Sequence, residues 1–116
     1  MKKRILIINT GGTLSSVNNE HGLSPGLSSK ELLEEFRMVS KNLELETEDF
    51  CSLDSANIFP DDWAALAVKI GQIYMNYEGI VIIHGTDTLA YTASMLSFML
   101  QNIPVPIVIT GSQLSI

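Results

Sequence analysis

The sequence is poor in the residues that build disulfide frameworks and metal sites. Its 116 residues include one cysteine, Cys51, and two histidines, His21 and His84. A single cysteine excludes an internal disulfide, and the histidines lack ligand-like spacing, which argues against structural zinc. Basic residues are scarce too, with 7 lysines and arginines against 13 acids. A net charge of −6 is unlike the basic footprint of a nucleic-acid-binding protein, so no nucleic-acid partner is expected.

Long apolar runs are also missing. The longest, Ile5–Ile8 and Gly79–Ile83, are strand-sized and far below the roughly 20 residues that span a bilayer. The basic start, Met1–Arg4, precedes an apolar run too short for a secretory signal, and Thr10–Thr13 indicates a turn rather than a cleavage site. We therefore expect a cytoplasmic protein without a membrane partner. Its composition, 46% hydrophobic and 17% charged, is that of a globular domain.

Four segments have the pattern of β-strands. Lys3–Asn9, Gly79–Ile83 and Pro104–Ile109 are apolar and rich in β-branched residues, which predicts strands buried on both faces. Asn42–Phe50 alternates leucine or threonine with glutamate. This alternation predicts a strand with one wet face, towards an edge of the sheet.

Helical patterns separate these strands. A capping box at Ser28 precedes apolar residues at helical spacing, which predicts a first helix. Pro60 with two aspartates suits the start of a second helix. The segment Thr88–Leu100 is predicted to be a third, rather apolar helix. Ser15–Gly26 is polar and rich in glycine, asparagine and serine, which predicts a loop. The order predicts an α/β fold of Rossmann or flavodoxin type, a mostly parallel sheet with helices on both faces.

The predicted sheet is unfinished. No crossover helix follows Pro104–Ile109 before the sequence stops at Ile116. We therefore expect the three apolar strands to be central, the glutamate-rich strand to lie near an edge, and residues 1–116 to be an incomplete amino-terminal domain.

Three apolar strands end in turns rich in glycine, threonine and serine: TGGT (Thr10–Thr13), HGTDT (His84–Thr88) and TGSQ (Thr110–Gln113). The segment after the glutamate-rich strand adds Ser55. Because ligands bind at the shared carboxyl edge of parallel strands, these segments are predicted to form one pocket.

The pocket would offer hydroxyl groups, backbone N–H groups and one carboxylate, Asp87. Such donors suit an anion held in a backbone nest, or a threonine nucleophile with N–H groups stabilising an oxyanion. Neither a Walker loop nor a G-x-G-x-x-G fingerprint occurs. Asp87 would repel phosphate and attract an ammonium group, which favours an amino-acid-like substrate.

These motifs resemble a known family. TGGTL (Thr10–Leu14), Asp54–Ser55, the segment from His84 to Leu100 and ITGSQ (Ile109–Gln113) are similar to the bacterial and archaeal L-asparaginases, nearest the cytoplasmic type. The resemblance covers essentially the whole chain. It implies an amidohydrolase that acts on L-asparagine without metal or organic cofactor, and a homo-oligomer when full length.

The resemblance also implies roles for single residues. Thr13 matches the nucleophile, which forms an acyl-enzyme, and Thr86 matches the second catalytic threonine. Asp87 matches the carboxylate that contacts the substrate's α-ammonium, and Ser55 the serine that holds its α-carboxylate. Ser112 falls where a backbone carbonyl faces the leaving amide, and Gly12 belongs to the turn around the substrate.

Two departures from the family bear on activity. The tyrosine usual in the loop after TGGT is matched by Leu23, and the lysine that partners the second threonine lies beyond Ile116, as does the carboxyl-terminal domain. This part alone is therefore expected to lack turnover. Two alternatives remain: the amidase component of a tRNA-dependent amidotransferase, and a non-catalytic module that binds asparagine or aspartate.

Overall fold

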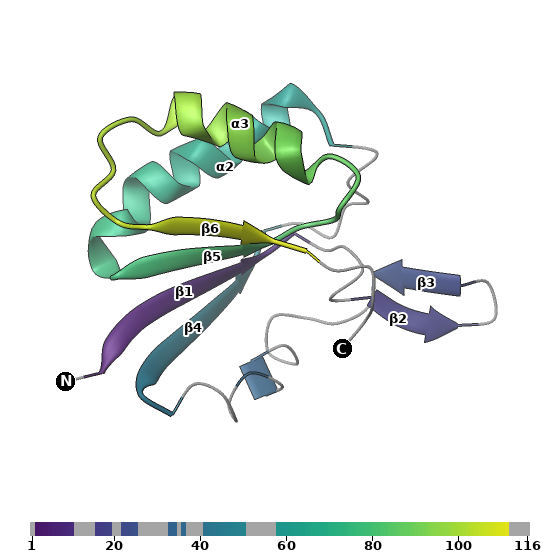
Figure 1. Cartoon of the computed structure of the whole chain (residues 1–116), viewed down its shortest axis with the longest axis horizontal. Helices are drawn as coiled ribbons and strands as arrows, with labels where there is room; N and C mark the ends of the chain where they lie inside the picture. Colours follow the sequence, from purple (N-terminus) through teal and green to yellow (C-terminus); the bar gives the residue numbers. More distant parts are fainter. Residues whose placement is uncertain are drawn as a thin grey trace.

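The core of the fold is one parallel sheet, seen in a computed structural model (Figure 1). Its strands are β1 (Lys3–Asn9), β4 (Leu43–Asp49), β5 (Gly79–Ile83) and β6 (Ile107–Thr110), in the spatial order β4-β1-β5-β6. The four strands confirm the predicted parallel α/β architecture. The structure describes residues 2–10, 16–19, 22–25, 33, 34, 36, 41–50 and 58–111.

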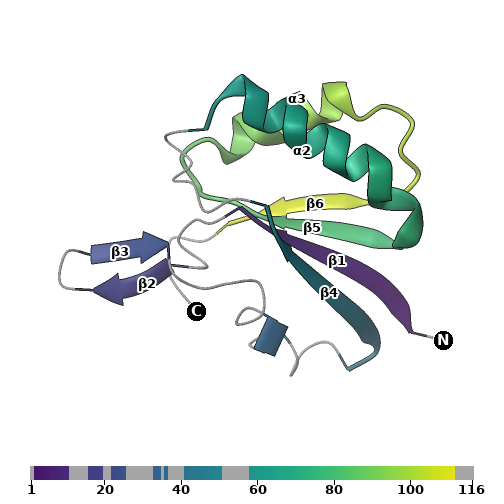
Figure 2. The same ribbon diagram turned by 180° about the vertical axis from the view of Figure 1, so that it is seen from behind.

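Two helices cover one face of this sheet. Both α2 (Pro60–Ile73) and α3 (Leu89–Met99) lie on the same side, as Figures 1 and 2 show from opposite directions. Alternate residues of the strands point towards them, because side chains alternate along a strand. The buried residues of this layer are Leu6, Ile8, Leu66, Ile70, Ile80, Ile82 and Leu96.

The first turn of α2 forms as the sequence predicts. Pro60 occupies the start of the helix, and the Asp62 carboxylate accepts a hydrogen bond from the Phe59 N–H at 2.7 Å. That contact is one half of a capping box and places negative charge at the positive end of the helix dipole. The helix ends at Ile73 and is followed by a 3-10 turn, η4 (Tyr74–Asn76).

The opposite face of the sheet has a smaller cluster. Ile7 and Ile83 are buried there, with Phe36 packed against them. Phe36 has helical backbone, as have Leu33 and Glu34, which agrees with the helix predicted after Ser28. Helical residues therefore contact both faces of the sheet.

The prediction that Pro104–Ile109 is a central strand is wrong for the described structure. β6 is the outer strand, paired only with β5 among the described residues, and Val108 on its surface is 54% exposed. The strand also begins at Ile107, after two prolines that have no N–H to donate to a ladder. The glutamate-rich β4 forms the other edge, as predicted.

The predicted loop at Ser15–Gly26 is a hairpin instead. β2 (Ser16–Asn19) and β3 (Gly22–Pro25) pair antiparallel, with Asn19 opposite Gly22. The pairing rests on the backbone rather than on an apolar alternation, which is why the polar sequence concealed it. The hairpin projects beyond the carboxyl ends of the sheet strands (Figures 1 and 2) and carries Leu23.

Candidate active site

The carboxyl ends of the inner strands are joined by hydrogen bonds just past the sheet. The Thr10 N–H donates to the Ile83 carbonyl at 2.9 Å, and the Thr10 hydroxyl donates to the same oxygen at 2.6 Å. The His84 N–H donates to the Thr110 carbonyl at 2.9 Å. The first residues of the TGGT and HGTDT turns are thus fixed to neighbouring strands, and the HGTDT turn is fixed to the start of TGSQ.

The outer strand β4 is joined to β1 in the same way. The Phe50 N–H donates to the Asn9 carbonyl at 2.9 Å, and the Asn9 side-chain amide donates to the Asp49 carboxylate at 3.1 Å. Asn9 and Thr10 are both buried. Hydrogen bonds therefore join the carboxyl ends of all four strands into one continuous row. The pocket is predicted on this side of the sheet.

Gly111 packs directly against the HGTDT turn. A Cβ atom at this position would lie 2.5 Å from the His84 carbonyl oxygen and 3.4 Å from the Thr86 methyl carbon. Real Cβ atoms essentially never come within 3.0 Å of another atom, so a residue without a side chain is required. The absence of a side chain lets Gly111 lie directly against the HGTDT turn.

His84 is buried among polar partners. Its Nδ1 lies 2.6 Å from the Gly85 carbonyl oxygen, and its Nε2 lies 2.9 Å from the Thr92 hydroxyl on α3. The ring of His84 therefore joins its own turn to helix α3. Trp63 on α2 extends the network, since its indole N–H donates to the same hydroxyl at 2.7 Å.

Sequence reasoning missed the link through Thr92 and Trp63. Thr92 is 0% exposed, in a helix that is otherwise mainly apolar. A buried threonine in such a helix needs a polar partner, and this was the available signal. The partners could not be named from the sequence because they come from two other elements.

Of the predicted site residues, the structure describes Thr86 and Asp87. Both lie in the turn between β5 and α3, whose N-cap is Thr88. Thr86 is half-buried and Asp87 is exposed. Asp87 thus lies next to the amino end of α3. Four predicted residues, Gly12, Thr13, Ser55 and Ser112, lie outside the described residues, so the pocket itself stays a prediction.

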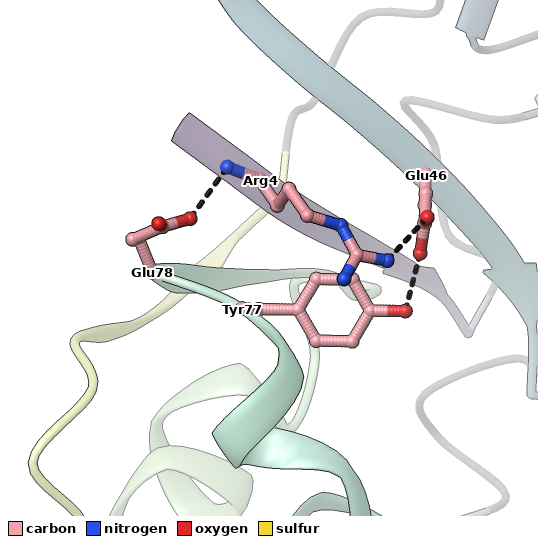
Figure 3. A network of polar contacts seen from close by, with 4 residues as sticks. All are labelled: Arg4, Glu46, Tyr77 and Glu78. Carbon is pink, nitrogen blue, oxygen red and sulfur yellow. Dashed lines mark hydrogen bonds and ion pairs between the residues drawn. The ribbon is translucent and has the colours of Figure 1, made fainter. Parts of the chain in front are cut away.

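A second polar cluster lies at the opposite end of the sheet (Figure 3). The Arg4 guanidinium donates to the Glu46 carboxylate at 2.6 Å, and the Tyr77 hydroxyl donates to the other oxygen of that carboxylate at 2.5 Å. The Arg4 guanidinium carbon lies 5.1 Å from the centre of the Tyr77 ring, in range of a cation–π contact. The Arg4 N–H donates to the Glu78 carboxylate at 2.5 Å.

This cluster shifts the protonation equilibria of its members. Burial, followed by the hydrogen bond to Glu46, raises the pKa of Tyr77 to about 12. Hydrogen bonds from Tyr77 and then from Arg4 lower the pKa of Glu46. The hydrogen bond to Glu46 raises the pKa of Arg4. These groups hold β1, β4 and the start of β5 together, far from the turns of the candidate site (Figures 1 and 3).

Two other features were sought in the described parts of the chain. No helix there is long and apolar enough to cross a membrane. Nor do three or more histidine, cysteine, aspartate or glutamate side chains gather there in a way that could hold a metal ion.

The parallel sheet and the polar turns at its carboxyl edge define an α/β protein of the class that binds ligands at that edge. Residues 4–116 match the family described as "Asparaginase, N-terminal", and the chain belongs to the asparaginase family. It is 43% identical to the L-asparaginase of Thermococcus kodakarensis, over 97% of this chain and 35% of that protein. It is also 38% identical to a glutamyl-tRNA(Gln) amidotransferase component of Saccharolobus solfataricus, over 98% of this chain and 26% of the relative.

Solved structures agree on the fold. The thermostable L-asparaginase of T. kodakarensis superposes with a TM-score of 0.85, covering 97% of this chain and 34% of that one. The probable cytoplasmic L-asparaginase of Campylobacter jejuni, 28% identical, superposes with a TM-score of 0.84 over 98% of this chain and 34% of its own. The chain therefore spans about a third of the length of these asparaginases.

Proposed function

We propose that the chain is the amino-terminal domain of an amidohydrolase that converts L-asparagine and water into L-aspartate and ammonia. The observation that carries the proposal is the continuous row of hydrogen bonds at the carboxyl ends of β4, β1, β5 and β6. Each motif predicted to contribute to the site follows one of these strand ends in the sequence. The 43% identity to an L-asparaginase supports the substrate, and the activity is proposed for the full-length protein.

In the proposed reaction the Thr13 hydroxyl attacks the side-chain amide carbon of asparagine. The hydroxyl proton passes to the leaving nitrogen, the carbon–nitrogen bond breaks, and ammonia departs, leaving an ester on Thr13. Water then cleaves the ester, which releases aspartate and restores the hydroxyl. Backbone N–H groups of the glycine-rich turn, including that of Gly12, stabilise the developing oxyanion, and Thr86 assists as the second threonine.

Three residues are proposed to orient the substrate. Asp87 pairs with the α-ammonium group and Ser55 binds the α-carboxylate. A backbone carbonyl at Ser112 faces the leaving amide. The short turn between β5 and α3 supports this assignment for Asp87, because His84 and Gly111 fix the turn from two sides. Such fixed positioning is what holds a substrate in reactive geometry.

The decisive experiment replaces the proposed nucleophile in the full-length protein. Thr13→Ala is expected to abolish ammonia release while leaving the circular dichroism spectrum unchanged. Thr13→Ser is the matched control, since it keeps a hydroxyl group and should retain part of the turnover. Ammonia release by Thr13→Ala at the unaltered rate would reassign the nucleophile, with Thr86 as the first replacement to examine.

A second candidate function is the amidase component of a tRNA-dependent amidotransferase, favoured by the 38% identity to the S. solfataricus relative. That function predicts ammonia transfer to glutamyl-tRNA in the presence of a partner protein. A non-catalytic module would instead bind asparagine without releasing ammonia. Incubating the full-length protein with asparagine alone, and then with charged tRNA and partner, separates the three functions.

We also propose that the full-length protein is cytoplasmic and forms a homo-oligomer. The C. jejuni structural relative, described as cytoplasmic, supports the location. Cell fractionation tests the location, and sedimentation of the purified full-length protein tests the assembly.

A further inference from the structure

A buried polar chain links both helices to the turn that carries Thr86 and Asp87. Thr92 on α3 is 0% exposed and His84 is 1% exposed. The Thr92 hydroxyl lies 2.7 Å from the indole nitrogen of Trp63 and 2.9 Å from Nε2 of His84. Among the described residues these are its two side-chain partners, and no buried side-chain polar atom there lacks a partner.

The direction of each hydrogen bond in this chain follows from its chemistry. An indole N–H only donates, so the Thr92 oxygen accepts from Trp63. A neutral imidazole carries a hydrogen on only one ring nitrogen, so the Thr92 hydroxyl donates to His84 Nε2 when Nδ1 is the protonated nitrogen. A carbonyl oxygen only accepts, so His84 Nδ1 carries the hydrogen shared with Gly85. The chain thus selects the Nδ1-protonated tautomer of His84.

This tautomer fixes the orientation of one peptide group. The Gly85 carbonyl is held 2.6 Å from the ring nitrogen, and the described chain has no cis peptide. Because a peptide group is planar, the Thr86 N–H points away from the ring, opposite the carbonyl. Gly111, just after β6, lies beside Thr86, since a Cβ atom added there would be 3.4 Å from the Thr86 methyl carbon. The two contacts together set the direction in which Thr86 and Asp87 leave the sheet.

We propose that Trp63 and Thr92 are positioning residues for the active site. They hold His84 in a single tautomer and, through its bond to Gly85, orient the peptide that leads to Thr86 and Asp87. The effect on substrate rests on the proposed function of those two residues. The tautomer of His84 does not depend on the proposed function, and it is measured independently.

The first test reads the tautomer by nitrogen NMR of the His84 ring in the full-length protein. Wild type is expected to show Nδ1 protonated and Nε2 as the acceptor. Thr92→Val keeps the shape but removes the hydroxyl, so the Nδ1-protonated form is held by Gly85 alone and the share of the Nε2-protonated form should rise. Thr92→Ser restores a hydroxyl and should restore the wild-type signature. Trp63→Phe removes the indole donor together with part of the ring, at a half-buried position on α2, and leaves the residues of α3 unchanged.

The second test measures aspartate affinity by calorimetry, and kcat and KM for ammonia release. Losing one buried hydrogen bond at the turn should weaken aspartate binding about tenfold in Thr92→Val, and Thr92→Ser should stay within about twofold of wild type. Ile70→Val is the matched control, because it trims a fully buried side chain on α2 outside the polar chain. It should lower the melting temperature without changing the tautomer or the affinity.

The outcomes separate the inference from the function on which it rests. A wild-type protein that neither binds aspartate nor releases ammonia refutes the proposed function. The NMR comparison would still show whether Thr92 and Trp63 hold His84 in one tautomer. If Thr92→Val and Trp63→Phe lower only the melting temperature, as Ile70→Val does, Trp63 and Thr92 are core residues and the positioning role is refuted. A wild-type His84 ring protonated at Nε2 alone would also refute it.

Discussion

The two ends of the parallel sheet are held by different kinds of polar contact. At the carboxyl end the contacts join mainly backbone groups, hydroxyls and one imidazole, with one bond from the Asn9 amide to the Asp49 carboxylate, and His84 and Thr92 are buried. At the amino end they join full charges that remain wet, with the Arg4 and Glu46 side chains 41% and 39% exposed. Exposed ion pairs contribute little and are screened by salt, whereas a buried polar group that loses its partner is costly. We therefore expect substitutions at the carboxyl ends of the strands to lower the stability of the protein more than substitutions at the amino ends.

The largest effect is expected from filling the space at Gly111. Gly111→Ala would push a Cβ atom against the His84 carbonyl, and such overpacking costs about 1–3 kcal/mol of stability. Gly71→Ala on α2 is the control, because a Cβ there meets nothing within 4 Å and alanine favours a helix by about 0.5–1 kcal/mol. Urea unfolding of both variants should give changes of opposite sign. A neutral Gly111→Ala would show that the two turns can separate freely.

Asp87→Asn should affect binding rather than stability. The side chain is exposed, so the free energy of unfolding should stay within about 0.5 kcal/mol of wild type. Loss of the charge that is proposed to pair with the substrate's α-ammonium should weaken aspartate binding about tenfold or more. Calorimetric titration of the full-length protein measures this, with thermal melting as the accompanying check. Equal affinities would mean that Asp87 takes no part in recognition.

At the amino edge, Tyr77→Phe should have a smaller effect that depends on pH. The folded protein raises the pKa of Tyr77 from 10.0 to about 12. A raised folded pKa stabilises the protein fully below the unfolded value and loses that contribution as pH rises through the folded value. The stability difference between wild type and Tyr77→Phe should therefore shrink between pH 10 and pH 12. Urea unfolding across that range measures it, and a constant difference would contradict the assignment.

The smallest effect is expected at Lys69, which donates from α2 to Glu48 on β4. Both side chains are partly exposed, so Lys69→Met should cost about 0–1 kcal/mol. That cost should vanish in about 1 M salt, where the screening length falls to about 3 Å. A loss of stability that persisted at high salt would show that this exposed pair behaves like the buried contacts of His84 and Thr92.

The sequence predicted the sheet well where the signal was apolar burial. Lys3–Asn9 and Gly79–Ile83 match β1 and β5 residue for residue, because strands buried on both faces leave continuous apolar runs. Whether a strand is central or outer depends on its neighbours rather than on its own residues, so β6 was misplaced. The β2–β3 hairpin was missed because backbone pairing leaves no apolar alternation to detect.

For the candidate site, the motifs predicted which strand ends would meet but not what holds them together. That the carboxyl ends of β1, β5 and β6 lie side by side followed from parallel topology alone. The support behind the HGTDT turn comes from Trp63 and Thr92, 29 residues apart in sequence. Such a pair becomes visible only when two helices are laid on the same face of a sheet.

The central position of β1 has a consequence for synthesis of the protein. β1 lies between β4 and β5 and pairs with both, yet it is translated before either. Its partner in β5 follows about 70 residues later, a delay of about 4–14 s at about 5–20 residues per second. Throughout that interval the Ile5–Ile8 run, buried on both faces in the finished sheet, has no complete surface to cover it. The nascent chain is therefore expected to need shielding of this run, by the ribosome or a chaperone, until β5 emerges.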